Sequence, residues 1–396
     1  MDLPDSVIVV VLVRLPIMDI ARLKLVCKGW KSLLESSYIR DLYENINQRK
    51  FSSPWSILYR DLSSNTALEF FCEEWGFRES LGSCVSRFLD EIKAANKNTR
   101  VHILAITDGL ILTELGPETF RVADPVLREW IKIPHPPPYS SRQDEFQGAA
   151  IVTNINNVGY KVVRYGVPVL GVRVMERDRL CFQIYSSDSK SWTYRHVPTQ
   201  RPISSILPSN PINKNGYLHW LCRASQVIFA YDFYGPSELC VVIDLPQRSA
   251  KGTQKPLWHG DEATLTISCG SVMYMNTDTG KPTQQLKIWR LKKYTSGSSS
   301  KESWEFLWNL RPGLELCLGC VPVAMHPFDK EIVYLVTCQT NFFQTHARLV
   351  IGNLRTKKFQ LQKDWKHKTM EFADYEPCFF HQFVLPQRLG SIPCPP

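Results

Sequence analysis

Long apolar runs are missing from this 396-residue chain. A membrane-spanning helix needs roughly 20 consecutive apolar residues, whereas the most conspicuous apolar run, Val7–Val13, has seven. A secretory signal begins with positive charge and ends in a small-residue cleavage site, but Asp2 and Asp5 precede this run and Arg14 follows it. We therefore expect a soluble intracellular protein of the cytoplasm or the nucleus, without a membrane partner.

Motifs of common catalytic sites are also missing. We find no Gly-rich phosphate loop, no Gly-x-Ser-x-Gly elbow and no His-Glu-x-x-His zinc helix, and the nine histidines are scattered without metal-like pairing. The sequence therefore predicts a protein that is not an enzyme and needs no cofactor. A copper oxidase, with His and Tyr ligands brought together from distant strands, is the enzymatic alternative.

The 12 cysteines lack the regular spacing of a disulfide framework, which favours reduced thiols. Only Cys317 and Cys320 have a ligand-like spacing, and a zinc site would need partners such as His326, Cys338 and His346. Apolar neighbours on both sides of the pair favour buried strand cysteines instead. We expect no bound metal.

Positive charge is in moderate excess, with 47 Lys and Arg against 38 Asp and Glu and a net charge of +9. The basic residues are scattered except in the segment Arg355–Lys368. A solvated strand face explains such a cluster more often than a nucleic-acid site, which would also need a recognisable binding motif. We do not expect nucleic acid as a partner.

Proline and aromatic residues are plentiful, with 26 Pro, 11 Trp and 15 Tyr. This composition favours β-structure with many turns. The length suggests one small and one large domain.

The apolar run Val7–Val13 fits either a strand or a helix. Its β-branched residues each lower helix propensity by up to ~0.7 kcal/mol relative to alanine, so local preference favours a strand. A strand needs a partner, however, and residues 17–34 show the three-to-four spacing of an amphipathic helix, with a break expected between Val26 and Gly29. We therefore predict a helix over this run.

A helix that is apolar around its whole circumference must be covered on all sides. The two short helices that follow form too small a unit to do this alone. Each valine or leucine left in water forfeits roughly 1.5 to 3 kcal/mol of burial. We therefore expect another protein to complete this core.

The landmarks of residues 2 to about 45 resemble the F-box motif, whose pattern runs L-P, I-L, L-P, L, V-C, W at the spacings found here. The resemblance implies a three-helix F-box domain over residues 1–48 that binds a Skp-family adaptor and, through it, a cullin scaffold. The alternative is a helical cap that packs on the large domain. The adaptor-binding residues that the resemblance implies are Leu3, Pro4, Ile8, Val11, Leu12, Leu15, Pro16, Leu23, Val26, Cys27 and Trp30.

Residues 49–99 form the next segment. The stretches TALEFFCEEWGF, residues 66–77, and CVSRFLDEIKAANKN, residues 84–98, both show helical spacing. We predict a helical or irregular connector that covers an end of the large domain.

The large domain is predicted over residues 100–385, with a tail at 386–396. A unit of strand, polar turn and second strand recurs every ~50 to 60 residues, which is typical of β-propeller blades. About six blades would fit. The fold class is therefore α+β multidomain, a small three-helix F-box followed by a large all-β, propeller-like domain. The recurring units are residues 120–134, 182–198, 227–246, 286–310 and 347–362.

This region resembles the F-box-associated domain of plant F-box proteins, through DPVLREW, GYKVVR, NGYLHWL, LKIWRL and MHPFDKEIVYL. A kelch-like fold fits, although the Gly-Gly doublet of strict kelch repeats is missing. We predict that Trp130, Trp192 and Trp304 pack between blades and that Tyr160 and Trp220 are core residues. The polar loops 140–148 and 294–303 are candidates for contact with a target.

Together these resemblances imply a substrate receptor of a cullin-RING ubiquitin ligase. The F-box would bind the adaptor and the β domain would hold an unknown target protein, so the mechanism is proximity. The alternative from another class is a carbohydrate- or small-ligand-binding β-propeller with a non-degradative role.

Overall fold

The structure is a computed structural model of the whole chain. The residues that it describes are 5–15, 19–20, 23, 26–36, 38–39, 42–43, 46, 54–61, 66–73, 80–95, 101–116, 119–125, 128–137, 144–154, 159–168, 177–203, 211–222, 225–246, 261–278, 284–292, 303–312, 320–341, 344–362 and 380–385.

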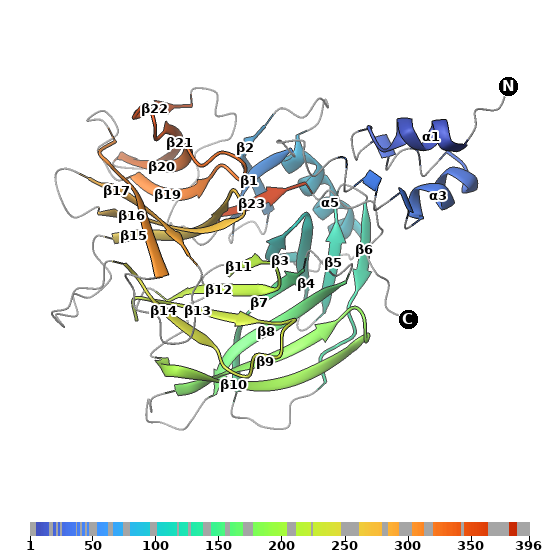
Figure 1. Cartoon of the computed structure of the whole chain (residues 1–396), viewed down its shortest axis with the longest axis horizontal. Coiled ribbons are helices and arrows are strands. Elements are labelled where there is room, and N and C mark those ends of the chain that lie inside the picture. Colours follow the sequence, from blue (N-terminus) through green and yellow to red (C-terminus); the bar gives the residue numbers. More distant parts are fainter. Residues whose placement is uncertain are drawn as a thin grey trace.

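The N-terminal part is helical and stands at one side of a large β-rich body (Figure 1). Helix α1 spans Asp5–Leu12, which confirms the prediction of a helix for the valine run. Helix α3 spans Lys28–Glu35, and Cys27 precedes it in an extended conformation, so the predicted break is confirmed as well. Further helical residues lie at 19–20, 23, 38–39, 42–43 and 46. Part of the region in which three helices were predicted lies outside the described residues.

The large body contains five four-stranded antiparallel sheets and one three-stranded sheet in the described part of the chain. Blade 1 is β3 (Val101–Thr107), β4 (Leu110–Leu115), β5 (Phe120–Asp124) and β6 (Glu129–Lys132). Blade 2 is β7 (Asp144–Thr153), β8 (Tyr160–Pro168), β9 (Arg177–Ser186) and β10 (Ser191–Ile203). Blade 3 is β11 (Ile212–Lys214), β12 (Tyr217–Cys222), β13 (Val227–Asp232) and β14 (Val241–Asp244).

The remaining blades complete the ring in Figure 1. Blade 4 is β15 (Asp261–Ser268), β16 (Ser271–Asp278), β17 (Leu286–Leu291) and β18 (Trp304–Leu310). Blade 5 is β19 (Cys320–Met325), β20 (Ile332–Asn341), β21 (Gln344–Asn353) and β22 (Lys358–Leu361). Blade 6 is β23 (Phe380–Val384), β1 (Trp55–Asp61) and β2 (Thr66–Cys72).

The first strands of the blades form a closed circle, in which β3, β7, β11, β15, β19 and β23 each contact the next and β23 contacts β3. This is the architecture of a six-bladed β-propeller, as predicted from the recurring hairpins. The five units recognised in the sequence are the third and fourth strands of blades 1 to 5. Blade 6 closes the ring, because its inner strand β23 comes from the C-terminal side and pairs with β1 from the N-terminal side.

Hydrophobic side chains fill the space between neighbouring blades. Five separate clusters lie between blades 1 and 2, 2 and 3, 3 and 4, 4 and 5, and 5 and 6. A sixth cluster lies between blades 6 and 1 and also includes the helical N-terminal part. Each blade therefore buries its faces only by stacking on its neighbours.

The prediction of a helical or irregular connector over residues 49–99 is partly wrong. Helix α5, Leu81–Ala95, confirms the second helical stretch, but residues 66–72 form strand β2 rather than a helix. Phe70 and Phe71 are both buried or half-buried on opposite faces of β2, so its apolar residues do not alternate as in a one-sided strand. The partner of β1 on its other edge is β23, which no local sequence pattern reveals.

Candidate functional site

Helix α1 has one face buried by its own chain. Val9, Leu12 and Val13 are 6%, 2% and 0% exposed and belong to the sixth hydrophobic cluster. With 3.6 residues per turn, these three positions fall on one side of the helix. This burial explains why β-branched residues form a helix here, since tertiary packing outweighs local propensity.

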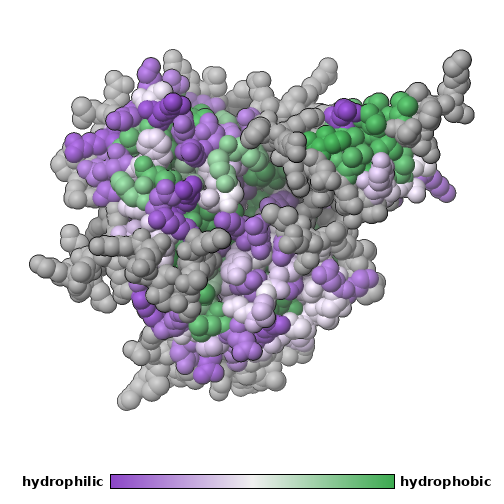
Figure 2. Space-filling model, in the orientation of Figure 1, coloured by the Kyte–Doolittle hydropathy of each residue, from purple (hydrophilic) through white to green (hydrophobic). Residues whose placement is uncertain are grey.

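The opposite face of α1 is apolar and exposed. Val7, Val10 and Val11 are 44%, 48% and 53% exposed, and their i, i+3, i+4 spacing places them in one stripe. Figure 2 shows this hydrophobic surface on the N-terminal helices. These valines are among the few large exposed hydrophobic residues of the described chain. We call Val7, Val10 and Val11 the valine face.

The valine face ends at a positive charge. Arg14 is exposed, falls in the same stripe one turn further on, and donates a hydrogen bond from its guanidinium to the Val10 carbonyl oxygen at 2.7 Å. A cation at a helix C-terminus also interacts favourably with the helix dipole. The face therefore offers apolar side chains with one guanidinium at its edge.

Helix α3 is held by short-range contacts at both ends. The Cys27 Sγ accepts a hydrogen bond from the Trp30 backbone N–H at 3.4 Å. Ser36 Oγ donates to the Leu33 carbonyl oxygen at 2.7 Å and accepts from the Ile39 N–H at 3.4 Å, so it links α3 to the next helical residues.

The sequence-predicted adaptor residues fall into three groups in the structure. Val11, Val26 and Cys27 are exposed. Leu12 is buried, so it supports the helix from inside. Four more are partly buried against the shared cluster, namely Ile8, Leu15, Leu23 and Trp30. Leu3, Pro4 and Pro16 lie outside the described residues.

Two members of the valine face, Val7 and Val10, were not among the predicted residues. The resemblance to a motif points to its landmark positions, and neither valine is one of them. Projection of residues 5–14 on a helical wheel identifies both, because they share the stripe of Val11.

The predicted packing of the outer-strand tryptophans between blades holds for two of the three. Trp192 Nε1 donates to the Pro134 carbonyl oxygen of blade 1 at 2.8 Å, and Trp304 Nε1 donates to the Asp244 carbonyl oxygen of blade 3 at 2.8 Å. The prediction is wrong for Trp130, which is 46% exposed and lies 4.2 Å from the Arg121 guanidinium of its own blade. Blade 6, which precedes blade 1 in the ring, has no fourth strand among the described residues.

The predicted core residues Tyr160 and Trp220 are buried, at 1% and 3% exposed. The predicted loop 140–148 is strand β7 from residue 144 onward, so that prediction is wrong there, and residues 140–143 and 294–302 lie outside the described part.

The positions weighed as metal ligands do not assemble into a site in the part of the chain that the structure describes. No group of three or more His, Cys, Asp or Glu side chains there is placed to share a metal ion. Cys320 is fully buried at the start of β19, and its N–H bonds to Gln284 Oε1 at 2.9 Å. His326 accepts a hydrogen bond from Trp55 Nε1 at 3.3 Å. Cys317 and the side chains of Cys338 and His346 are not described.

Two further expectations concern membrane-spanning helices and the basic segment Arg355–Lys368. Among the described helices, none is long and apolar enough to cross a membrane. The structure describes residues 355–362 of the basic segment, and the residues of strand β22 within it alternate between exposed and half-buried, which confirms a solvated strand face there.

Comparison with protein families agrees with this architecture. Residues 1–42 match the F-box domain, and residues 53–379 match the family described as F-box protein At3g26010-like, beta-propeller. The matching propeller family does not confirm the kelch-like assignment.

Individual relatives match over nearly their whole length. The chain is similar to F-box protein At1g49990 of Arabidopsis thaliana, at 30% identity over 98% of this chain and 97% of that protein. It is similar to F-box protein At3g26010 of the same species at 30% identity, over 100% of this chain and 91% of that protein. F-box protein At3g28330 is 29% identical, over 97% and 94% of the two chains.

Proposed function

The chain belongs to the At3g26010-like family of F-box proteins with a β-propeller, and from this premise we propose that it is the substrate receptor of a cullin-RING ubiquitin ligase. In this proposal α1 binds a Skp-family adaptor, the adaptor binds a cullin, and the propeller holds a target protein. The reaction is accelerated by proximity, since tethering raises the effective concentration of target lysines near the ubiquitin-conjugating enzyme.

The observation that carries the proposal is the valine face. A helix with valines on both sides leaves apolar surface in water unless its second side is also covered. Val7, Val10 and Val11 are each about half exposed, and full burial of a valine contributes roughly 1.5 to 3 kcal/mol, so each could still contribute about 1 kcal/mol on binding. Arg14 at the edge of the face favours an acidic group on the adaptor.

The proposed adaptor contacts are the exposed residues Val7, Val10, Val11, Val26 and Cys27. The partly buried residues Ile8, Leu15, Leu23 and Trp30 would contribute through their exposed edges, and Leu12 by holding the helix in place. Because Leu15 packs against the chain's own core, a charge at Leu15 would disturb folding as well as adaptor binding. A charge at an exposed position tests adaptor binding without disturbing the core.

The test is titration of a purified Skp-family adaptor into the full chain and into Val11→Asp. A carboxylate placed in an apolar contact must be desolvated without a partner, so we expect at least about a 100-fold loss of affinity, or about 2.7 kcal/mol. The matched control is Phe306→Asp on β18, because Phe306 is 55% exposed and lies on the propeller. Unchanged affinity of Val11→Asp, or an equal loss in both variants, would contradict the proposal.

Target binding is assigned to the propeller as a whole. Its described surface carries isolated exposed aromatic residues, Trp130 on β6 and Phe306 on β18, on different blades. Affinity purification of the full chain, with mass spectrometry of the retained proteins, identifies the target.

A further inference from the structure

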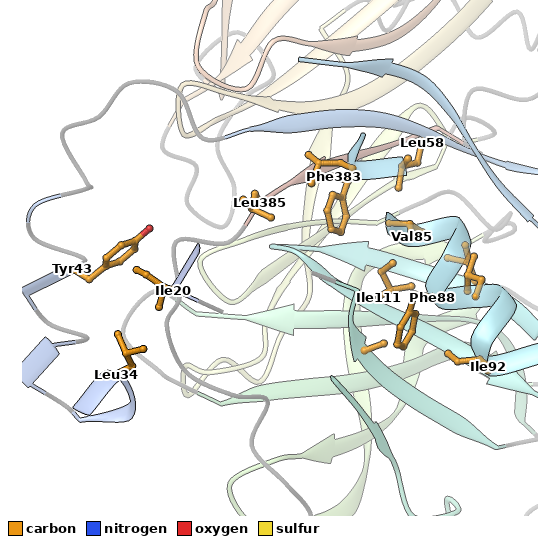
Figure 3. Packing of buried hydrophobic residues seen from close by; sticks show 14 of the residues in the cluster. Ile20, Leu34, Tyr43, Leu58, Val85, Phe88, Ile92, Ile111, Phe383 and Leu385 are labelled. Carbon is orange, nitrogen blue, oxygen red and sulfur yellow. The ribbon is translucent and has the colours of Figure 1, made fainter. Parts of the chain in front are cut away.

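The hydrophobic core of the F-box continues into the propeller. A single cluster of buried side chains joins helices α1 and α3 to helix α5 and to strands of blades 6 and 1. Figure 3 shows the F-box residues on one side, the propeller residues on the other, and Leu385 between them. The labelled members are Ile20, Leu34, Tyr43, Leu58, Val85, Phe88, Ile92, Ile111, Phe383 and Leu385.

The two ends of the propeller ring meet at this place. Strand β1 begins at Trp55, which lies opposite Val384 at the end of β23. The next residue, Leu385, donates its N–H to the Pro54 carbonyl oxygen at 2.9 Å. Leu385 is therefore fixed at the point where the chain passes from the F-box into the propeller, and its position depends on closure of the ring by β23.

Helix α5 completes the propeller side of the cluster. The Glu69 carboxylate accepts a hydrogen bond from the Gly82 N–H at 2.7 Å, which attaches the first turn of α5 to strand β2. From there Val85, Phe88 and Ile92 pack in the same cluster as Leu58 of β1 and Ile111 of β4. The propeller side of the cluster thus combines residues from both ends of the chain.

Burial on the F-box side is equally complete. Leu34 and Tyr43 are 0% and 5% exposed, and Leu385 is 4% exposed. Burial raises the pKa of Tyr43 to about 12. Domains of one chain move relative to each other by default, unless their interface is large and hydrophobic. Here a swing of the F-box away from the propeller would expose apolar side chains of both.

We propose that strand β23, through Leu385, holds the F-box in one orientation on the propeller, so that ring closure and the direction of the valine face are set together. The functional meaning rests on the proposed function. A fixed orientation keeps the adaptor on α1 and the target on the propeller at a constant separation, which a stiff connection achieves and a loose one does not.

The test measures the distance distribution between the two parts in the full chain. Fluorophores are introduced through noncanonical amino acids at Ser32 on α3 and Thr193 on β10, both exposed, and energy transfer is recorded for single molecules. We expect one narrow distribution for the parent chain. Leu385→Ala should broaden it by about twofold, as the F-box becomes a tethered domain.

The matched control is Leu354→Ala. Leu354 also follows the end of a strand, is 0% exposed, and donates its N–H to the Glu331 carbonyl oxygen at 2.7 Å, but it lies in the cluster between blades 4 and 5. This variant should keep the narrow distribution. A broad distribution in the parent chain, or a narrow one in Leu385→Ala, overturns the proposal.

Two further variants keep the result interpretable. If Leu385→Ala does not fold, Tyr43→Ala truncates the same cluster from the F-box side and should broaden the distribution with the propeller intact. A narrow distribution in folded Tyr43→Ala overturns the proposal. Val11→Asp should lose the adaptor and keep the narrow distribution, so failure of the proposed function and failure of this inference give different results.

Discussion

His219 on strand β12 is a deeply buried titratable residue of blade 3. It is 2% exposed, and burial lowers its pKa from 6.5 to about 4, with hydrogen bonds to the backbone of Ile212 and Tyr217 opposing the shift and the charge of Lys214 adding to it. The folded chain therefore holds this imidazole neutral, whereas the unfolded chain protonates it at an ordinary pKa.

Stability should consequently fall in acid. Above pH 6.5 His219 is neutral in both states and its contribution is fully present, and it is lost as the pH falls from about 6.5 through 4. The loss amounts to about 3 kcal/mol at most. Urea unfolding of the parent chain and His219→Gln between pH 7 and pH 4 measures it as the difference between the two pH profiles. Parallel profiles would show that His219 does not contribute.

Two helical glycines should respond to alanine in opposite directions. A Cβ at Gly82 in α5 would lie 2.4 Å from the Glu69 Cβ, whereas the nearest atom to a Cβ at Gly29 in α3 is the Cys27 Sγ at 3.9 Å. Gly29→Ala should therefore gain up to about 1 kcal/mol from helix propensity. Gly82→Ala should lose about 1 to 3 kcal/mol through overpacking. Denaturant unfolding of both variants compares them, and a stabilised Gly82→Ala would contradict the packing described.

At the scale of the elements, side-chain amides connect different blades through hydrogen bonds to backbone groups. Gln382 on β23 accepts from the Ile267 N–H at 3.3 Å and donates to the carbonyl oxygens of Ile267 at 3.2 Å and Met325 at 2.6 Å. It thus links blade 6 to blades 4 and 5. Gln284 makes the equivalent pair of bonds to Cys320 across blades 4 and 5.

We expect Gln382→Met to destabilise the chain by about 2 kcal/mol, because similar volume is kept while backbone groups of two blades lose their partner. Gln360→Met on the exposed face of β22 is the control and should change stability by less than about 0.5 kcal/mol. Equal unfolding free energies of the two variants would show that the amide contacts of Gln382 are energetically unimportant.

The outer hairpins could be predicted from the sequence because their contacts are local. In blades 1, 2 and 5 the third and fourth strands are joined by a short segment, as in 182–198, where Tyr185 and Trp192 face each other across the turn. The helix over the valine run could also be predicted, since the next segment offers no partner strand.

Contacts between distant segments could not be predicted in this way. Strand β2 has helix-like apolar spacing, and its sheet is completed by residues 380–384 at the other end of the chain. No local sequence pattern predicts the role of Gln382, because a single glutamine is typical of a surface position. For the candidate site, the motif gave Val11 and Val26, but only the helix geometry separates exposed Val11 from buried Leu12.

At the scale of the whole molecule, six blades form a ring, and the F-box shares the hydrophobic cluster that lies where this ring closes. Helix α1, which carries the half-exposed valine face, lies at the side of the large β-rich body (Figure 1). In the proposed function, the helical part binds one partner and the propeller is a separate scaffold for another.

The most direct test of the central claim is the composition of the assembled complex. The full chain, a Skp-family adaptor and a cullin are mixed in equal amounts, separated by size-exclusion chromatography, and the mass of each peak is measured by light scattering. Our account predicts one 1:1:1 complex that forms with the adaptor and not without it. Elution of the chain as a separate monomer in the presence of both partners would contradict the account.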